Sequence, residues 1–278
     1  MPAVELQQRL LADLQQFAVP RHARWDPLGL MGVRESLRER LSALGKLEEH
    51  HFDRAGEAGV NLILKLPGQK ANASPLLVGA HYDGPLHSPG ADDNASGLAA
   101  LLELAQRWRT EPPRRPVWLV AFDQEEWGMV GSEALATELR ATGQPLKLMV
   151  SLEMLAFTSE EQAYPHPAMR QVYGSTGNFI ALVANTSAGL MLPGLSAAMG
   201  RYVKTKVLPV PNRGAGMPDV RLSDHSPFWD QGYNALMVTD TSYMRNPHYH
   251  QMSDTVDSLD LPFFCQVVNG LDAALSRL

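Results

Sequence analysis

Imidazole and carboxylate side chains gather in four short segments of this 278-residue sequence. The segments are a loop with His81, Asp83, Asp92 and Asp93, the pair Glu125-Glu126, the single residue Glu153, and the stretch 246–251. Mixed imidazole and carboxylate ligands suit zinc, manganese or cobalt. Such an ion lowers the pKa of a bound water to about 7, which supplies hydroxide at neutral pH. The residue types therefore predict metal-dependent hydrolysis.

Apolar runs precede three of these segments and predict buried strands that end at them. The runs cover 76–81, 117–122 and 146–152, with predicted helices over 95–108 and 128–142 between them. Strand, helix and strand then alternate as in a right-handed crossover unit. Ligands of open α/β sheets bind at the carboxyl ends of the strands. Several carboxylates buried together there would be costly without a cation, which favours a metal.

The rest of the chain continues the same alternation of elements. Helical spacing covers 3–17, 29–44 and 261–278, and strand-like runs cover 47–54, 59–67, 179–184 and 235–239. Residues 201–223, rich in Pro and Gly, predict a loop with an edge strand. The alternation predicts a three-layer α/β/α fold around a mixed, mostly parallel central sheet. No repeat or break in composition divides the chain, so we expect a single catalytic domain over 1–278.

Composition and charge limit the partners and the compartment. A net charge of −6 gives no reason to expect a nucleic-acid partner. The single cysteine, Cys265, excludes an intrachain disulfide and fits a reducing compartment. The N-terminal residues lack the order of a signal peptide, and no apolar run approaches the ~18 residues of a membrane span. We therefore expect a cytoplasmic protein with no membrane partner.

Several short motifs follow one another along the chain. They are His81-Tyr82-Asp83, Gly90–Gly97, Glu125–Gly128 with Gly131-Ser132, Ser151–Met154, Ser223–His225 and Tyr249-His250. They resemble, in the same order, the motifs of the co-catalytic zinc exopeptidases. This is the family of bacterial leucyl aminopeptidase and aminopeptidase S, and it is related to glutamate carboxypeptidase II. The resemblance covers roughly residues 29–275 and implies the zinc-peptidase (phosphorylase/hydrolase-like) form of the α/β/α fold.

The resemblance implies a set of metal ligands. Asp92 would bridge two zinc ions, for which cobalt or manganese could substitute. His81 and Glu153 would complete one site, and Glu126 and His250 the other. The family usually has Asp in place of Glu153, so the longer side chain is a departure. The family also has a cis peptide between the two Asp residues of its motif, which would apply here to Asp92-Asp93.

Two further carboxylates receive roles outside the ligand set. Glu125 would be the general base, because a carboxylate beside a metal-bound water can take its proton and pass it to the leaving amine. Asp83 would orient His81, since a carboxylate behind a ligating histidine fixes its tautomer. The implied activity is that of an aminopeptidase acting on a peptide or small aminoacyl substrate. The oligomeric state is left open.

Three other functions remain open at this point. One is a carboxypeptidase or an amidohydrolase acting on acylated amino acids, with Arg221 or Arg245 reading a carboxylate. A surface salt bridge is nevertheless the role we expect of both arginines. The second is a glutaminyl-cyclase-like transferase, and the third is a binding module without metals. The intact set of acidic and imidazole groups argues against the third.

Two pairs of residues near the motifs need a choice. His248 competes with His250 as a ligand, since the two would lie on the same face of an extended segment. The Tyr-His-Gln context favours His250. Asp224 and His225 open a predicted helix, where we expect them to cap and pack near the site.

Overall fold

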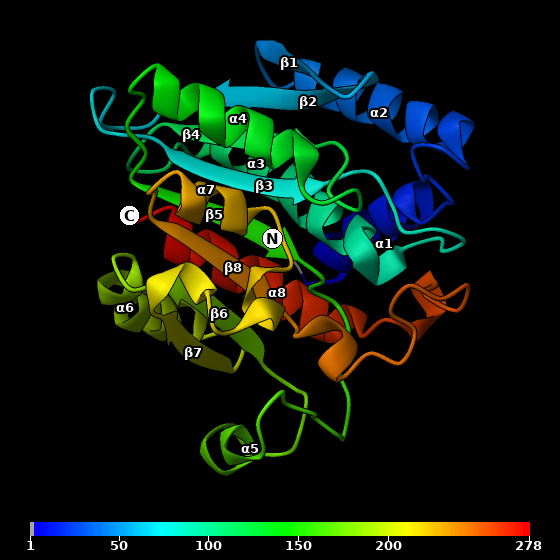
Figure 1. Cartoon of the computed structure of the whole chain (residues 1–278), viewed down its shortest axis with the longest axis vertical. Helices are drawn as coiled ribbons and strands as arrows, with labels where there is room; N and C mark the ends of the chain where they lie inside the picture. Colours follow the sequence, from blue (N-terminus) through cyan, green and yellow to red (C-terminus); the bar gives the residue numbers. More distant parts are fainter. Residues whose placement is uncertain (1–2) are drawn as a thin grey trace.

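An eight-stranded sheet lies at the centre of the molecule (Figure 1). The computed structural model describes residues 3–278. The strands are β1 (Leu47–Arg54), β2 (Glu57–Leu66), β3 (Leu76–His81), β4 (Val117–Phe122), β5 (Leu148–Glu153), β6 (Ile180–Asn185), β7 (Thr205–Val210) and β8 (Ala235–Thr239). All the strands that the sequence predicted are present, including the edge strand within 201–223, which is β7.

The strands follow the order β1-β2-β4-β3-β5-β8-β6-β7. From β4 through β3 and β5 to β8 the neighbours run parallel, as do β6 and β7. The pairs β1–β2, β2–β4 and β6–β8 are antiparallel. The prediction of a mixed, mostly parallel central sheet is therefore confirmed.

Helices cover both faces of the sheet and make the three layers (Figure 1). Their bounds are α1 (Ala3–Phe17), α2 (Pro27–Ser42), α3 (Gly97–Thr110), α4 (Val130–Ala141), α5 (Pro167–Tyr173), α6 (Leu192–Met199), α7 (His225–Asp230) and α8 (Leu261–Leu275). Apolar side chains of α1, α3 and α8 pack on one face, and those of α4 and α7 on the other. No helix in this described part of the chain is long and apolar enough to cross a membrane.

The central strands are apolar along their whole length because both of their faces are covered. In β3, Leu76, Val78 and Ala80 join the core under α3, whereas Leu77 joins the core under α4 and α7. Successive residues of a strand point to opposite faces, so two-sided burial requires an uninterrupted apolar run. The run at 76–81 is such a sequence, which is why its strand could be predicted to the residue.

Polar residues begin at the carboxyl ends of three neighbouring parallel strands. His81 is the last residue of β3, Glu153 is the last residue of β5, and Asp123 directly follows β4. The register pairs His81 with Phe122 and Gly79 with Ser151, so these ends lie at one level. Strands of this kind bring imidazole and carboxylate groups from distant parts of the sequence together.

Candidate metal centre

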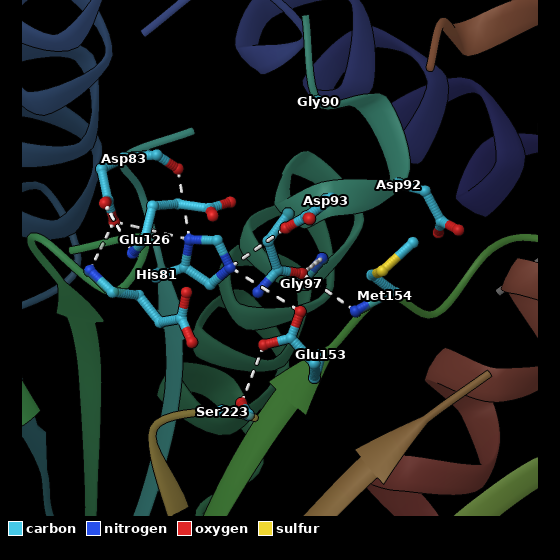
Figure 2. Close-up of polar contacts among 12 residues, drawn as sticks. His81, Asp83, Gly90, Asp92, Asp93, Gly97, Glu126, Glu153, Met154 and Ser223 are labelled. Atoms are coloured by element: carbon cyan, nitrogen blue, oxygen red, sulfur yellow. Dashed lines mark hydrogen bonds and ion pairs between the residues drawn. The ribbon is translucent and has the colours of Figure 1, made fainter. Parts of the chain in front are cut away.

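The carboxylate of Asp93 lies between two histidines. Its Oδ1 is 3.3 Å from His81 Nε2, and its Oδ2 is 3.1 Å from His250 Nε2. Glu153 Oε1 lies 3.7 Å from His81 Nε2, and Glu126 Oε2 lies 3.4 Å from His250 Nε2. The nitrogen and oxygen atoms that could bind a metal thus form two groups that share Asp93. Within each group, these donor atoms lie within 4.8 Å of one another. Figure 2 shows the His81 half of this arrangement.

The prediction that Asp92 is the shared carboxylate is wrong. Asp92 Oδ1 accepts a hydrogen bond from the backbone N–H of Ala156 at 3.0 Å, and its Oδ2 accepts one from Asn246 Nδ2 at 2.8 Å. Its side chain points away from His81, whereas that of Asp93 points toward it (Figure 2). The cis peptide is likewise one residue further on, between Asp93 and Asn94. We therefore transfer the shared position from Asp92 to Asp93.

The loop that carries Asp93 departs from regular helix geometry. Residues 91–96 form a π-helical turn before α3, and Asp93 and Asn94 have non-helical backbone angles within it. Gly90 opens the turn with a φ of 59°, in the left-handed region. The helix expected over 95–108 therefore begins at Gly97. Because this turn follows neither a helical nor a strand period, spacing alone does not show which aspartate faces the site.

Two buried groups that the sequence did not point to hold this loop. The Asp254 carboxylate accepts the backbone N–H groups of Asp92 at 2.9 Å and Asp93 at 3.1 Å. The fully buried Arg21 guanidinium donates to the carbonyl oxygens of Gly90 at 3.0 Å and Asp93 at 3.2 Å. Neither residue belongs to a motif, and Arg21 comes from a segment that reads only as a loop. Their positions could be found only from the tertiary structure.

Asp83 links the end of β3 to the loop after β4. Its Oδ1 lies 3.5 Å from His81 Nδ1, and its carbonyl oxygen lies 3.2 Å from the same nitrogen. Its two carboxylate oxygens also accept hydrogen bonds from the backbone N–H groups of Glu125 at 3.0 Å and Glu126 at 3.1 Å. One carboxylate therefore sets the orientation of an imidazole and of the glutamate pair together.

The side chains of Glu153 and Glu125 complete the cluster. Ser223 Oγ donates to Glu153 Oε2 at 2.8 Å, which fixes the longer arm of this residue (Figure 2). Glu125 forms a third group of donor atoms with Glu126 and His81, again within 4.8 Å. The structure thus brings together the predicted residues His81, Glu125, Glu126, Glu153 and His250.

The histidine choice also has a clear geometry. The His248 Nδ1 atom lies 2.9 Å from Ser253 Oγ, and the ring packs edge-on against Phe157 with centroids 5.8 Å apart. His250 instead faces the donor cluster, and the ring of Tyr249 stacks on it at 3.8 Å. His248 therefore lies outside the donor groups.

The buried carboxylates of the cluster favour the binding of a cation. Burial raises the pKa values of Glu125, Glu126 and Glu153, and neighbouring carboxylates add to the effect. His81 Nε2 and Glu126 Oε1 are buried without a hydrogen-bond partner within residues 3–278. A divalent ion would satisfy such lone pairs and remove the repulsion between the carboxylates. The residues therefore fit a zinc ion bound by nitrogen and oxygen.

The two arginines considered from the sequence differ in their surroundings. Arg221 makes the expected salt bridge, 2.6 Å from Asp230. Arg245 contradicts the expectation of a surface salt bridge, because it is buried with 6% exposure. Its guanidinium donates to the carbonyl oxygens of Gly177 and Phe179, both at 2.9 Å. Arg245 therefore holds the loop before β6 in place through these hydrogen bonds.

Asp224 and His225 are buried at the start of α7. Asp224 makes no side-chain cap hydrogen bond, so the capping role expected for it is wrong. Burial raises the pKa of Asp224 to about 7. His225 does pack, with its ring edge-on to Trp229 at 4.4 Å, and its Nε2 lies 2.9 Å from the Val220 carbonyl oxygen. Burial lowers the pKa of His225 to about 3.

A cavity of about 580 Å³ opens beside the donor cluster. Asp93, Glu125, Glu126, Glu153 and His250 line one end of it. The remaining walls are largely apolar and come from β6, β7, β8 and the loops around them. A concave, mainly apolar space with a few convergent polar groups is the usual form of a small-molecule site.

Fold and site together define a class, that of metal-dependent hydrolases with an α/β/α fold. The chain belongs to peptidase family M28, whose family model matches residues 61–270. The resemblance to the co-catalytic zinc exopeptidases is thereby confirmed.

Relatives with similar sequences cover most of this chain. The Escherichia coli protein YfbL, described as uncharacterised, is 35% identical over 214 residues, which covers 72% of this chain and 66% of YfbL. A probable leucine aminopeptidase of Trichophyton verrucosum is 25% identical over 219 residues, which covers 72% of this chain and 52% of that protein. The chain therefore spans between half and two thirds of the length of these relatives.

Solved structures share the fold at lower sequence identity. The LapA aminopeptidase of Legionella pneumophila has a TM-score of 0.67 and 17% identity, with 99% of this chain and 73% of LapA covered. A glutaminyl cyclase of Bacteroides thetaiotaomicron bound to N-acetylhistamine has a TM-score of 0.69 and 15% identity, with 99% and 98% covered. The predicted fold class is confirmed, but one fold serves both chemistries and does not choose between them.

Proposed function

We propose that this chain is a zinc-dependent aminopeptidase that removes the N-terminal residue of a peptide. The observation that carries the proposal is the Asp93 carboxylate, which lies between two groups of nitrogen and oxygen donors. His81, Asp93 and Glu153 would hold one zinc ion, and Asp93, Glu126 and His250 a second. Bound zinc would polarise the substrate carbonyl and lower the pKa of the attacking water.

Glu125 is placed to act as the general base. It lies within 4.8 Å of donor atoms of His81 and Glu126, and its backbone is fixed by the hydrogen bond to Asp83. Burial raises the pKa of its carboxyl group, which makes the carboxylate a stronger proton acceptor. Glu125 would take a proton from water as the water oxygen bonds to the carbonyl carbon. It would then give that proton to the amine as the C–N bond breaks.

The charge of the site favours a substrate with a free amino group. Carboxylates of Asp93, Glu125, Glu126 and Glu153 line the end of the cavity where the peptide bond would lie. The charges of two zinc ions would balance those of the four carboxylates, so the loaded site would offer a substrate carboxylate no net positive charge to bind. Neither Arg221 nor Arg245 adds a free positive charge there, since one is bound to Asp230 and the other to backbone carbonyls. The proposal therefore places the free amine at the metal centre.

The fold shared with a glutaminyl cyclase gives a second candidate function. A cyclase would close an N-terminal glutamine on itself and release ammonia, without consuming water. Mass spectrometry of the products from a glutaminyl peptide separates the two activities. A peptide shortened by one residue supports the aminopeptidase, and a peptide of full length that has lost ammonia contradicts it.

The glutamate pair provides the test of mechanism. Glu125→Gln keeps the size of the side chain but removes the base, so we expect kcat on an aminoacyl anilide to fall by about 10²–10⁴ with zinc content unchanged. Glu126→Gln should lose zinc together with activity. Glu160→Gln, an exposed glutamate outside the cavity, is the matched control and should resemble the wild type.

Two outcomes would contradict these roles. If Glu125→Gln lost zinc and Glu126→Gln retained it, the two roles would be exchanged. If neither change slowed turnover, the proposed site and mechanism of hydrolysis would be wrong.

A further inference from the structure

A row of side chains crosses the floor of the cavity, away from the metal centre. The strand register pairs Glu153 with Thr239, Thr239 with Ala181, and Ala181 with Lys206. Residues paired across neighbouring strands project from the same face of a sheet. All four residues line the cavity. Lys206, on the edge strand β7, therefore stands in the same row as the candidate zinc ligand Glu153.

The row sets the length of a ligand that could reach both ends. Three strand spacings of ~4.8 Å place the Cα atoms of Glu153 and Lys206 roughly 14 Å apart. A metal–oxygen bond of ~2 Å, one substrate residue of ~3.5 Å and a hydrogen bond of ~2.9 Å fit within that span. The flexible lysine stem can take up the remainder. The span therefore suits a charged group about one residue away from the reacting carbonyl.

The surroundings of Lys206 leave its charge available to a ligand. The side chain is half-buried, and its ammonium lies 5.9 Å from the centre of the Phe179 ring. The next row of the floor is apolar, with Val183 paired to Leu208 and to Met237. Within residues 3–278, Lys206 makes no ion pair. The carboxylate of Asp219, on the cavity wall, accepts a hydrogen bond from the Tyr243 hydroxyl instead.

We propose that Lys206 binds a carboxylate of the substrate and selects aminoacyl substrates that carry one. This inference rests on the proposed function, because it places the reacting carbonyl at the metal centre. The carboxylate has two possible sources with the same chemistry. It is either the side chain of an acidic N-terminal residue or the C-terminal carboxylate of a dipeptide. An apolar floor with one cation at its far end matches a ligand with an aliphatic stem and a terminal acid.

Two pairs of substrates test the inference on the zinc-loaded enzyme. One pair is the p-nitroanilides of glutamate and glutamine, and the other is alanyl-alanine and its C-terminal amide. We expect the wild type to have a higher kcat/KM for the acid member of at least one pair. In Lys206→Met the ratio of kcat/KM for the acid member to kcat/KM for the neutral member should fall by about 10- to 100-fold. This is the effect of losing a hydrogen bond to a charged group. Lys206→Glu should reverse the preference.

The pattern of loss identifies the source of the carboxylate. A loss confined to the anilide pair assigns the side-chain carboxylate, and a loss confined to the dipeptide pair assigns the C-terminal one. Lys204→Met is the matched control, because Lys204 is exposed, lies outside the cavity and carries the same charge. Its ratios should equal those of the wild type. If Lys206→Met changed both members of each pair by the same factor, or changed neither, the inference would be wrong.

A binding measurement separates this inference from the proposed function. Titration calorimetry on the Glu125→Gln variant compares the dipeptide with its amide, and glutamate with glutamine, without turnover. If Lys206-dependent binding of the acid member occurred in a wild type that hydrolysed no substrate, the aminopeptidase proposal would fail and this inference would stand. Equal binding of acid and neutral members in the presence of Lys206 would overturn it.

Discussion

Asp92 and Asp93 are neighbours in the sequence with opposite surroundings, and substitution separates them. Asp93 faces His81 and His250, so Asp93→Asn should lose most of the bound zinc and most of the activity. Asp92 accepts hydrogen bonds from Ala156 and Asn246, so Asp92→Asn should keep its zinc and lower the free energy of unfolding by about 1–3 kcal/mol. Elemental analysis and denaturant unfolding of the two variants check this. Zinc loss confined to Asp92→Asn would reverse the assignment.

At the same scale, the sequence identified side chains that lie at the ends of regular elements. His81 ends β3, Glu153 ends β5, and Glu125 and Glu126 follow β4. The apolar runs of these strands therefore located all four residues. Asp93 could not be chosen over Asp92, because the π-helical turn that carries them has no period from which a direction could be read. The ligand and base roles of these side chains stay predictions, tested by the substitutions above.

At the scale of elements, the apolar pattern predicted the strands and most helices, because two-sided burial leaves a continuous signal in the sequence. It did not predict what holds the loops between them. Arg21 follows α1 in a segment without periodicity, yet its guanidinium is fully buried among carbonyl oxygens of the loop before α3. Such a role depends on contacts between segments about 70 residues apart, which local sequence cannot reveal.

The hydrogen bonds of the Arg21 guanidinium give a prediction about the loop that carries Asp93. Arg21→Met keeps an apolar stem but leaves the carbonyl oxygens of Tyr82, Pro89 and Gly90 without their buried donor. We expect the free energy of unfolding to fall by about 3–5 kcal/mol, as when one partner of a buried charged network is removed. Zinc affinity should fall as well, because the loop loses a fixed position.

The control for Arg21 lies in the same segment. Arg24 is exposed and pairs with the exposed Glu57 at 2.8 Å, so Arg24→Met should cost less than about 1 kcal/mol and leave zinc affinity unchanged. Denaturant unfolding and competition of each variant with a chelator measure the two quantities. An Arg21→Met protein with the stability and zinc affinity of Arg24→Met would show that the hydrogen bonds of Arg21 are not needed to hold the loop.

At the scale of the whole molecule, we expect stability and metal binding to be coupled through the sheet. The candidate metal centre would draw its ligands from the ends of β3 and β5, from the turn before α3 and from the loops after β4 and β8. The two helix layers pack on this same sheet, so we propose that the chain behaves as one catalytic domain. In that case a change at the metal centre should move a single cooperative unfolding transition rather than one of several.

Removing the metal should therefore lower the melting temperature, and the loss should grow with pH. Without a cation, burial raises the pKa values of Glu125, Glu126 and Glu153 above the ordinary value of 4.5. The folded apo protein then binds more protons than the unfolded chain, so its stability falls as the pH rises above about 4.5. Zinc should remove this repulsion, and zinc at 100 times its Kd adds about 2.7 kcal/mol. Calorimetric scans with zinc and with chelator, from pH 5 to 8, should show a gap that widens with pH. A gap of zero, or one that narrows, would mean that these carboxylates do not share a metal centre.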